Sequence, residues 1–200
     1  MRRLPRGGFR RRIGEAQPVK FLTQERLRPI THAMSDLSFS IDAMSAADHD
    51  AVERLHARAF GPGRFARTAY RIREEAGEGA GLSFVARVGS LLVAAVQLTP
   101  ISLGETRAFM LGPLTVDPPF EGRGIGRALL QRCEDAARAL KSDLILLVGD
   151  EPYYRRAGYV RVPMGRVTLP GPVDPMRLLA LELTPGALAK AQGTVRGVRG

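Results

Sequence analysis

The sequence predicts an α/β fold with a mixed, mostly antiparallel central sheet flanked by helices. Two strand-like segments at 83–88 and 91–99 meet at Gly89-Ser90, which is a hairpin signal. A continuous apolar run at 144–148 is typical of a central strand that is buried on both faces. Between these segments, residues 121–130 read EGRGIGRALL, three alternating glycines that lead into a helical pattern.

The elements before the hairpin follow from periodicity and capping signals. Residues 38–42 alternate as a first strand, and Ser45 with Asp48 resembles a capping box. A helix should follow, and the glycines and proline of 61–63 should end it. A second helix is predicted at 68–75. The apolar face of the first helix consists of Val52, Leu55, Ala59 and Phe60.

The elements after the hairpin alternate between strand and helix. Residues 107–116 form a strand that Gly112-Pro113 interrupts, because proline cannot donate to a sheet ladder. A long helix begins at Gly124, a short one at Pro152, and the last strands are 159–162 and 177–183. The long helix has a single apolar face, which predicts that Cys133 is buried: Ile125, Leu129, Cys133, Ala136 and Leu140.

Length and composition predict one domain at 38–183, a basic disordered extension at 1–37 and a C-terminal tail at 184–200. The 200 residues are 44% hydrophobic, without an apolar run near the ~20 residues that span a bilayer. The net charge is +10, of which residues 1–34 contribute 9 − 2 = +7 and the remainder +3. One cysteine excludes an internal disulfide and, with three histidines, disfavours a metal site. These features predict a cytoplasmic protein.

The basic extension has several interpretations. It could bind nucleic acid or an anionic surface electrostatically, and its arginines resemble those of a transit peptide. It could also be an unfolded extension, or translation could start at Met34 or Met44. The mild charge of the remaining chain argues against nucleic-acid binding by the domain itself.

The glycines at 121–126 favour an anion site. Glycines let the backbone approach a ligand closely, and a helix N-terminus directs several N–H groups at one point. Arg127 and Ala128 stand where a P-loop needs Lys and Ser or Thr, and the glycine spacing does not fit a dinucleotide fingerprint. A phosphate-bearing ligand at Gly122–Arg127 is the hypothesis, and an ordinary structural turn is the alternative.

Two ordered motifs resemble the GNAT superfamily of N-acetyltransferases. The first, Gln/Arg-x-x-Gly-x-Gly/Ala, matches 121–126 except that Glu121 stands at the Gln/Arg position. The second, Tyr-x-x-x-Gly-Phe/Tyr, matches Tyr154 to Tyr159, with Gly158 as its glycine. The resemblance covers about residues 38–183 and is nearest to the YhbS-like branch of the superfamily.

This resemblance implies an enzyme that transfers an acetyl group from acetyl-CoA, without a metal, to a small-molecule or peptide amine by direct attack. Tyr154 is then the general acid, with Tyr153 as the fallback and a purely packing role for Tyr154 as the alternative. In this superfamily the region between the first two strands usually covers the acceptor site, which implies acceptor contacts at Arg64, Phe65 and Tyr70; a solvated basic helix face is the alternative. The implied cofactor contacts are Leu114, Val116, Gly122, Arg123, Gly124, Ile125, Gly126 and Arg127.

Other functions remain open. The same glycine loop could hold acyl-CoA in a sensor or scaffold that does not turn it over. As a second alternative, the protein could associate with nucleic acid through residues 1–34. Asp150 and Glu151 could act as bases, but capping the helix near Pro152 is the preferred interpretation. A homodimer is also open.

Overall fold

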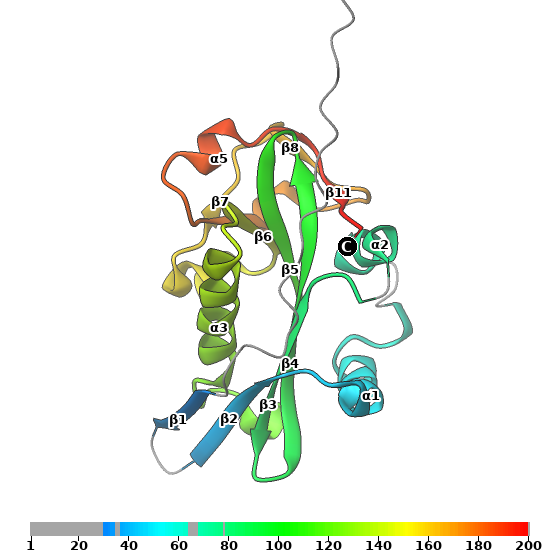
Figure 1. The fold of residues 1–200 in the computed structure, drawn as a ribbon, viewed down its shortest axis with the longest axis vertical. Helices are drawn as coiled ribbons and strands as arrows, with labels where there is room; N and C mark the ends of the chain where they lie inside the picture. The colour runs from blue at the N-terminus through cyan, green and yellow to red at the C-terminus, as the bar shows by residue number, and fades with distance from the viewer. Residues whose placement is uncertain (1–29, 35–36, 64–67, 78, 200) are drawn as a thin grey trace, which may run out of the picture.

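The computed structural model describes residues 30–34, 37–63, 68–77 and 79–199 (Figure 1). A nine-stranded sheet runs in the order β1-β2-β3-β4-β5-β6-β9-β7, with β11 paired to β4. Among the described pairs of this sheet only β5 with β6 is parallel. Its strands are β1 (Ile30–Met34), β2 (Leu37–Ala43), β3 (Leu82–Val88), β4 (Leu91–Leu103), β5 (Thr106–Val116), β6 (Leu144–Val148), β7 (Val160–Arg161), β9 (Leu178–Glu182) and β11 (Arg196–Gly197).

Helices cover both faces of the sheet, which confirms the predicted fold class. Figure 1 shows α1 (His49–Phe60) and α2 (Thr68–Ala76) on one side and α3 (Ile125–Ala139) on the other. The apolar face of α3 packs on the sheet, and Cys133 is fully buried there, as predicted. Burial raises the pKa of the Cys133 thiol, an effect that the charge of Arg132 only partly opposes, so the thiol stays protonated.

The C-terminal segment is part of the fold, which corrects the tail predicted at 184–200. It contains α5 (Ala187–Lys190) and β10 (Gly193–Thr194), which pairs with β8 (Val167–Thr168). β11 then pairs with Ile101 and Ser102 of β4. Burial of Ala187, Ala191 and Val195 fixes this segment to the domain. The sheet also begins before the predicted boundary at residue 38, because β1 pairs with β2.

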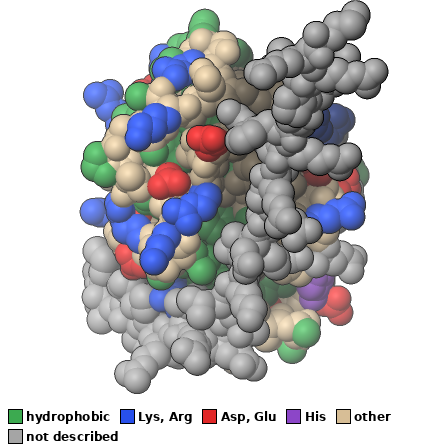
Figure 2. Space-filling model, turned by 45° about the horizontal axis from the view of Figure 1, so that its top comes forward, with side chains coloured by type: hydrophobic (Ala, Val, Ile, Leu, Met, Phe, Trp, Pro, Cys, Tyr) green, Lys and Arg blue, Asp and Glu red, His purple; other side chains and the backbone are tan. Residues whose placement is uncertain are grey.

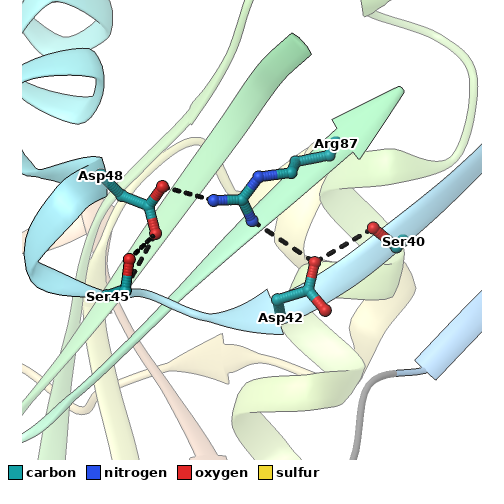
Figure 3. A network of polar contacts seen from close by, with 5 residues as sticks. All are labelled: Ser40, Asp42, Ser45, Asp48 and Arg87. Carbon is teal, nitrogen blue, oxygen red and sulfur yellow. Dashed lines mark hydrogen bonds and ion pairs between the residues drawn. The ribbon is translucent and has the colours of Figure 1, made fainter. Parts of the chain in front are cut away.

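A polar network ties the start of α1 to the sheet (Figure 3). The Ser45 N–H and hydroxyl both donate to Asp48 Oδ2 at 2.8 Å, which confirms the predicted capping box. Arg87 of β3 donates to Asp48 Oδ1 and, at 3.3 Å, to Asp42 Oδ2. The Ser40 hydroxyl donates to the same Asp42 oxygen at 3.0 Å. Burial opposes ionisation of Asp48, but the hydrogen bonds from Ser45 and Arg87 outweigh it and lower its pKa.

We expect Asp48→Asn to reduce stability at neutral pH by about 1–3 kcal/mol, because it removes a charged partner of Arg87. A lowered folded-state pKa means that ionised Asp48 stabilises the fold above the ordinary carboxyl pKa. This contribution disappears as the pH falls through the folded-state value. Thermal unfolding between pH 7 and about pH 3 should therefore show a weaker acid dependence in the variant than in the wild type. Asp50→Asn, at an exposed position of α1, is the control; equal effects of the two substitutions would contradict the prediction.

Candidate active site

The sheet opens between β5 and β6. The two strands pair in parallel from Ala108 with Leu144 to Leu111 with Leu147. Beyond this point β5 continues to Val116, whereas β6 ends at Val148 and the next residue stays bonded on the β9 side: the Gly149 N–H donates to the Arg177 carbonyl at 2.9 Å. The opening starts where β5 bulges, as its interruption at Gly112-Pro113 predicts. Here two residues of β5, Gly112 and Pro113, lie opposite Gln97 alone in the register with β4.

The unpaired edge of β5 faces this opening. The Asp117 N–H donates to the Val93 carbonyl of β4 at 2.8 Å. Hydrogen-bonding direction alternates along an antiparallel strand, so Thr115 also points to β4, while the backbone groups of Leu114 and Val116 point away from it. β6 pairs only as far as Leu111, so these groups can pair with an extended ligand.

The glycine loop lies at the end of the same strand. Gly122 and Gly124 have φ of 71° and 81°, left-handed conformations that favour glycine, and Gly124 is the N-cap of α3. Gly126 is buried in the first turn, where an added Cβ would overlap the Tyr153 hydroxyl and lie 3.6 Å from Val116 Cγ2. Arg123 and Arg127 are exposed beside the loop. The loop therefore presents a helix N-terminus, free of a side chain at Gly126, next to the β5 edge.

Two tyrosines of α4 (Glu151–Tyr154) complete the site and point in different directions. Tyr153 is 47% exposed, and its hydroxyl reaches across to Gly126 of α3. The Tyr154 ring lies against Gly149 and packs edge-on to Tyr159, with ring centroids 5.8 Å apart. The two rings are themselves perpendicular at 4.9 Å. Tyr154 thus stands at the β6 side of the opening and Tyr153 spans towards the glycine loop.

Both hydroxyls remain protonated at neutral pH. Burial, followed by the charges of Tyr153 and Asp150, raises the pKa of Tyr154, and Arg177 opposes this only partly. Burial and then the negative charge of Glu121 raise the pKa of Tyr153. Each tyrosine can therefore donate a proton or a hydrogen bond. Glu121 is the residue that departs from the family motif, and its negative charge helps to keep the Tyr153 hydroxyl protonated.

Asp150 and Glu151 both have arginine partners. Asp150 occupies the N-cap position of α4 without a side-chain cap bond, and its Oδ1 lies 3.1 Å from Arg177 Nη2. Glu151 pairs with Arg161 of β7. Asp150 therefore does not make the predicted side-chain cap, and each of the two carboxylates is held by an arginine instead.

Positive charge continues from the glycine loop into a cavity of about 190 Å³ between α3 and η5 (Arg155–Ala157). Arg127 and Arg156 line it, and no ion pair involves either one within the described residues. The buried Tyr159 hydroxyl is also at this cavity and has no hydrogen-bond partner in the described part of the chain. Glu134 lines the cavity as well, but its carboxylate is paired with Arg138, so the two arginines supply the unpaired charge of the lining.

Of the predicted acceptor contacts, Arg64 and Phe65 lie outside the described residues. Tyr70 is 3% exposed and lies inside the α1–α2 layer, with its ring 6.5 Å from that of His56. The Arg73 guanidinium covers the Tyr70 ring at 4.3 Å. Within the described ranges no cluster of metal-ligating side chains occurs, and no helix there is long and apolar enough to cross a membrane.

The reach of Tyr153 to Gly126 was not foreseen from the sequence. The pairing YY at 153–154 is the one available signal, because adjacent residues of a helix point in directions about 100° apart.

A mixed sheet that opens between β5 and β6, next to a helix whose N-terminus is formed by glycines, is the architecture of the acyl-CoA-dependent acyltransferases. The chain belongs to the acetyltransferase (GNAT) family, whose sequence profile matches residues 49–159. Enzymes of this family use acetyl-CoA as co-substrate. No curated protein matches the sequence significantly.

Solved structures share the fold at low sequence identity. The GNAT family N-acetyltransferase YhbS of Escherichia coli, in complex with CoA, aligns with a TM-score of 0.68 and 22% identity, over 83% of this chain and 93% of its own. A GNAT family acetyltransferase of Brucella melitensis, in complex with acetyl-CoA, aligns at 0.58 and 21% over 80% and 92%. One from Staphylococcus aureus aligns at 0.58 and 16% over 73% and 99%. At these identities the likeness is one of fold.

Proposed function

We propose that this protein transfers an acetyl group from acetyl-CoA to an amine, with Tyr154 as the general acid. The observation that carries the proposal is the unpaired edge of β5 at Leu114 and Val116, which runs directly to the N-terminus of α3. The amides of a pantetheine arm fit the first feature, and a pyrophosphate fits the second. YhbS and the Brucella acetyltransferase were solved with CoA and acetyl-CoA, respectively.

Residues around the opening have separate roles in this proposal. Acetyl-CoA supplies an activated acetyl group as a thioester. The N–H groups at 124–127, helped by Arg123 and Arg127, hold its phosphates, and Arg156 adds charge at the neighbouring cavity. A backbone N–H of Leu114 stabilises negative charge on the carbonyl oxygen, and Tyr154 protonates the departing sulfur. An amine attacks directly, so no enzyme nucleophile is needed.

The Tyr154→Phe variant tests this assignment. We expect its kcat to fall by about 10- to 1,000-fold, in the range of lost general acid catalysis, with little change in CoA affinity. Tyr153→Phe should do the opposite, because its hydroxyl faces the glycine loop: weaker CoA binding and a nearly unchanged kcat. Thiol release and calorimetry measure the two quantities. Equal kcat in Tyr154→Phe and wild type would overturn the role of Tyr154.

A non-catalytic acyl-CoA sensor is the second candidate, and the ion pairs of Asp150 and Glu151 favour it, because they hold the two carboxylates that the sequence offers as bases. Tight acetyl-CoA binding without thiol release over a broad amine panel would support it. We also propose a cytoplasmic location, consistent with a single cysteine.

Nucleic-acid association through the basic N-terminal residues is the weakest candidate. On the face shown in Figure 2, basic side chains alternate with acidic ones over the described surface, without forming one continuous positive field. Deletion of residues 1–29 should leave acetyl transfer unchanged, whereas loss of salt-dependent RNA binding on that deletion would favour this candidate.

A further inference from the structure

The cavity between α3 and η5 extends away from the α3 N-terminus. Its α3 wall is one face of the helix over two turns: Arg127, Leu130, Gln131 and Glu134. The rest of the lining consists of Arg156 and Ala157 of η5, and of Tyr159. At the rise of an α-helix, Glu134 lies about 10 Å along the axis from Arg127. The field of a helix terminus acts only within the first turn, so the charge of this cavity has to come from its side chains.

The Tyr159 hydroxyl is a buried donor at this cavity. Tyr159 is 1% exposed, and its oxygen has no hydrogen-bond partner within the described residues. Burial, with the neighbouring Cys133, Tyr154 and Glu134, raises the pKa of Tyr159, so the hydroxyl keeps its proton. Since buried hydroxyls are nearly always paired in native proteins, this one indicates an occupant that accepts a hydrogen bond.

The charges of the lining favour a negatively charged occupant. Arg127 and Arg156 are exposed, and neither forms an ion pair with any other described residue. The acidic residue of the lining, Glu134, accepts from Arg138 at 2.8 Å. A water molecule could accept from Tyr159, but it would leave the two guanidinium groups without a counter-charge. A cavity of about 190 Å³ is far larger than one water requires and has room for a phosphate group.

From this arrangement we infer that the cavity between α3 and η5 is a second anion site, distinct from the α3 N-terminus, that binds a phosphate group. Tyr159 donates a hydrogen bond to a phosphate oxygen, and Arg127 and Arg156 neutralise the charge. Two molecules could supply this group. One is CoA, whose 3′-phosphate is separate from its pyrophosphate; this source rests on the proposed function. The other is a free phosphate ion, which does not depend on that function.

Comparison of CoA with 3′-dephospho-CoA tests the first source. We expect the full-length protein to bind CoA at least about tenfold more tightly in calorimetry, which corresponds to one charge-assisted hydrogen bond. Arg156→Ala and Tyr159→Phe should each remove most of this difference, by weakening the binding of CoA and leaving that of dephospho-CoA unchanged. Arg155→Ala is the matched control, because Arg155 is exposed on η5 and is not among the residues that line the cavity. A tenfold difference that persists in Arg156→Ala and Tyr159→Phe would overturn the inference.

Inorganic phosphate without CoA tests the second source, against chloride at the same ionic strength. If a free ion is the ligand, CoA and dephospho-CoA bind equally, and phosphate raises the Tm of the wild type and of Arg155→Ala but not that of Arg156→Ala. A rise that Arg156→Ala retains would place the ion at the α3 N-terminus and overturn the inference. Equal binding of the two CoA forms without any rise in Tm would overturn it as well. Absence of CoA binding, with a rise in Tm that depends on Arg156, would overturn the proposed function and leave the anion site standing.

Tyr159→Phe also separates a binding role of the hydroxyl from a structural one. Without ligand, the loss of a buried hydroxyl that has no partner should leave the Tm at or above the wild-type value. In the same variant, the gain in Tm from CoA or from phosphate should be smaller than in the wild type. A lower Tm without ligand, together with an unchanged gain from the ligand, would show that the hydroxyl supports the fold and would overturn its role in binding.

Discussion

Gly126→Ala is expected to weaken CoA binding by about 100-fold, or about 2.7 kcal/mol, while the protein remains folded. Gly126 lies in the first turn of α3, where an added Cβ would occupy the space in front of the helix N-terminus and push on the Tyr153 hydroxyl. Charge-assisted hydrogen bonds from N–H groups to phosphate contribute about 1.5–3 kcal/mol each, so the loss of one or two accounts for the effect. Isothermal titration calorimetry with CoA measures it.

The fold should tolerate this substitution for two reasons. Alanine is a better helix former than glycine, and the overlapping atom is the end of a tyrosine side chain that can rotate. Gly63→Ala is the matched control, because a Cβ at Gly63 meets nothing within 4 Å. An unchanged Kd in Gly126→Ala, with the Tm of both variants near that of the wild type, would exclude the α3 N-terminus as the phosphate site.

Gly81→Ala should have the largest effect on stability, about 3 kcal/mol or more. Gly81 has φ of 96°, and an added Cβ would overlap the Leu98 carbonyl oxygen of β4, a backbone atom that cannot rotate away. It would also lie 3.0 Å from Pro100 Cδ. Displacement of β4 at this point would disturb its pairing with both β3 and β5. Urea denaturation measures the change in the free energy of unfolding.

Gly77→Ala separates the cost of the left-handed backbone from the cost of the overlap with β4. Gly77 has a similar φ of 91°, but a Cβ there meets nothing within 4 Å. The control should therefore lose only the cost of the left-handed backbone, about 1–2 kcal/mol. Equal losses in the two variants would mean that β4 moves freely and that close packing at Leu98 contributes nothing.

Elements with strong periodicity were predictable. The pattern correctly places the hairpin of β3 and β4, the apolar β6 and the apolar face of α3. Each of these elements buries one or both faces, so apolar residues recur in it at regular spacing. The bulge in β5 was predictable from Gly112-Pro113, because proline has no N–H to donate to the sheet ladder.

The strands β8 and β11 were not predictable, because segments of two residues have no period to detect, whereas β7 lies within the strand predicted at 159–162. β11 is held by a partner far away in sequence, and its glycine and arginine resemble a tail. The glycine loop could be placed from its motif alone. The directions of Tyr153 and Tyr154 could not, because they depend on how the one-turn helix α4 is rotated.

β11 has a consequence for the order in which the molecule is assembled during synthesis. Its Gly197 N–H donates to Glu75 of α2 at 3.1 Å, across 122 residues of chain, and Arg196 pairs with the same carboxylate. A Cβ at Gly197 would lie 2.7 Å from the Ala76 nitrogen, so the two backbones are in close contact. The contacts between α2 and β11 can form only after residue 197 has left the ribosome, whereas the contacts of α2 with β4 and β5 involve segments that are synthesised earlier. The packing around α2 is therefore completed last, after the strands beside the proposed acetyl-CoA site have been synthesised.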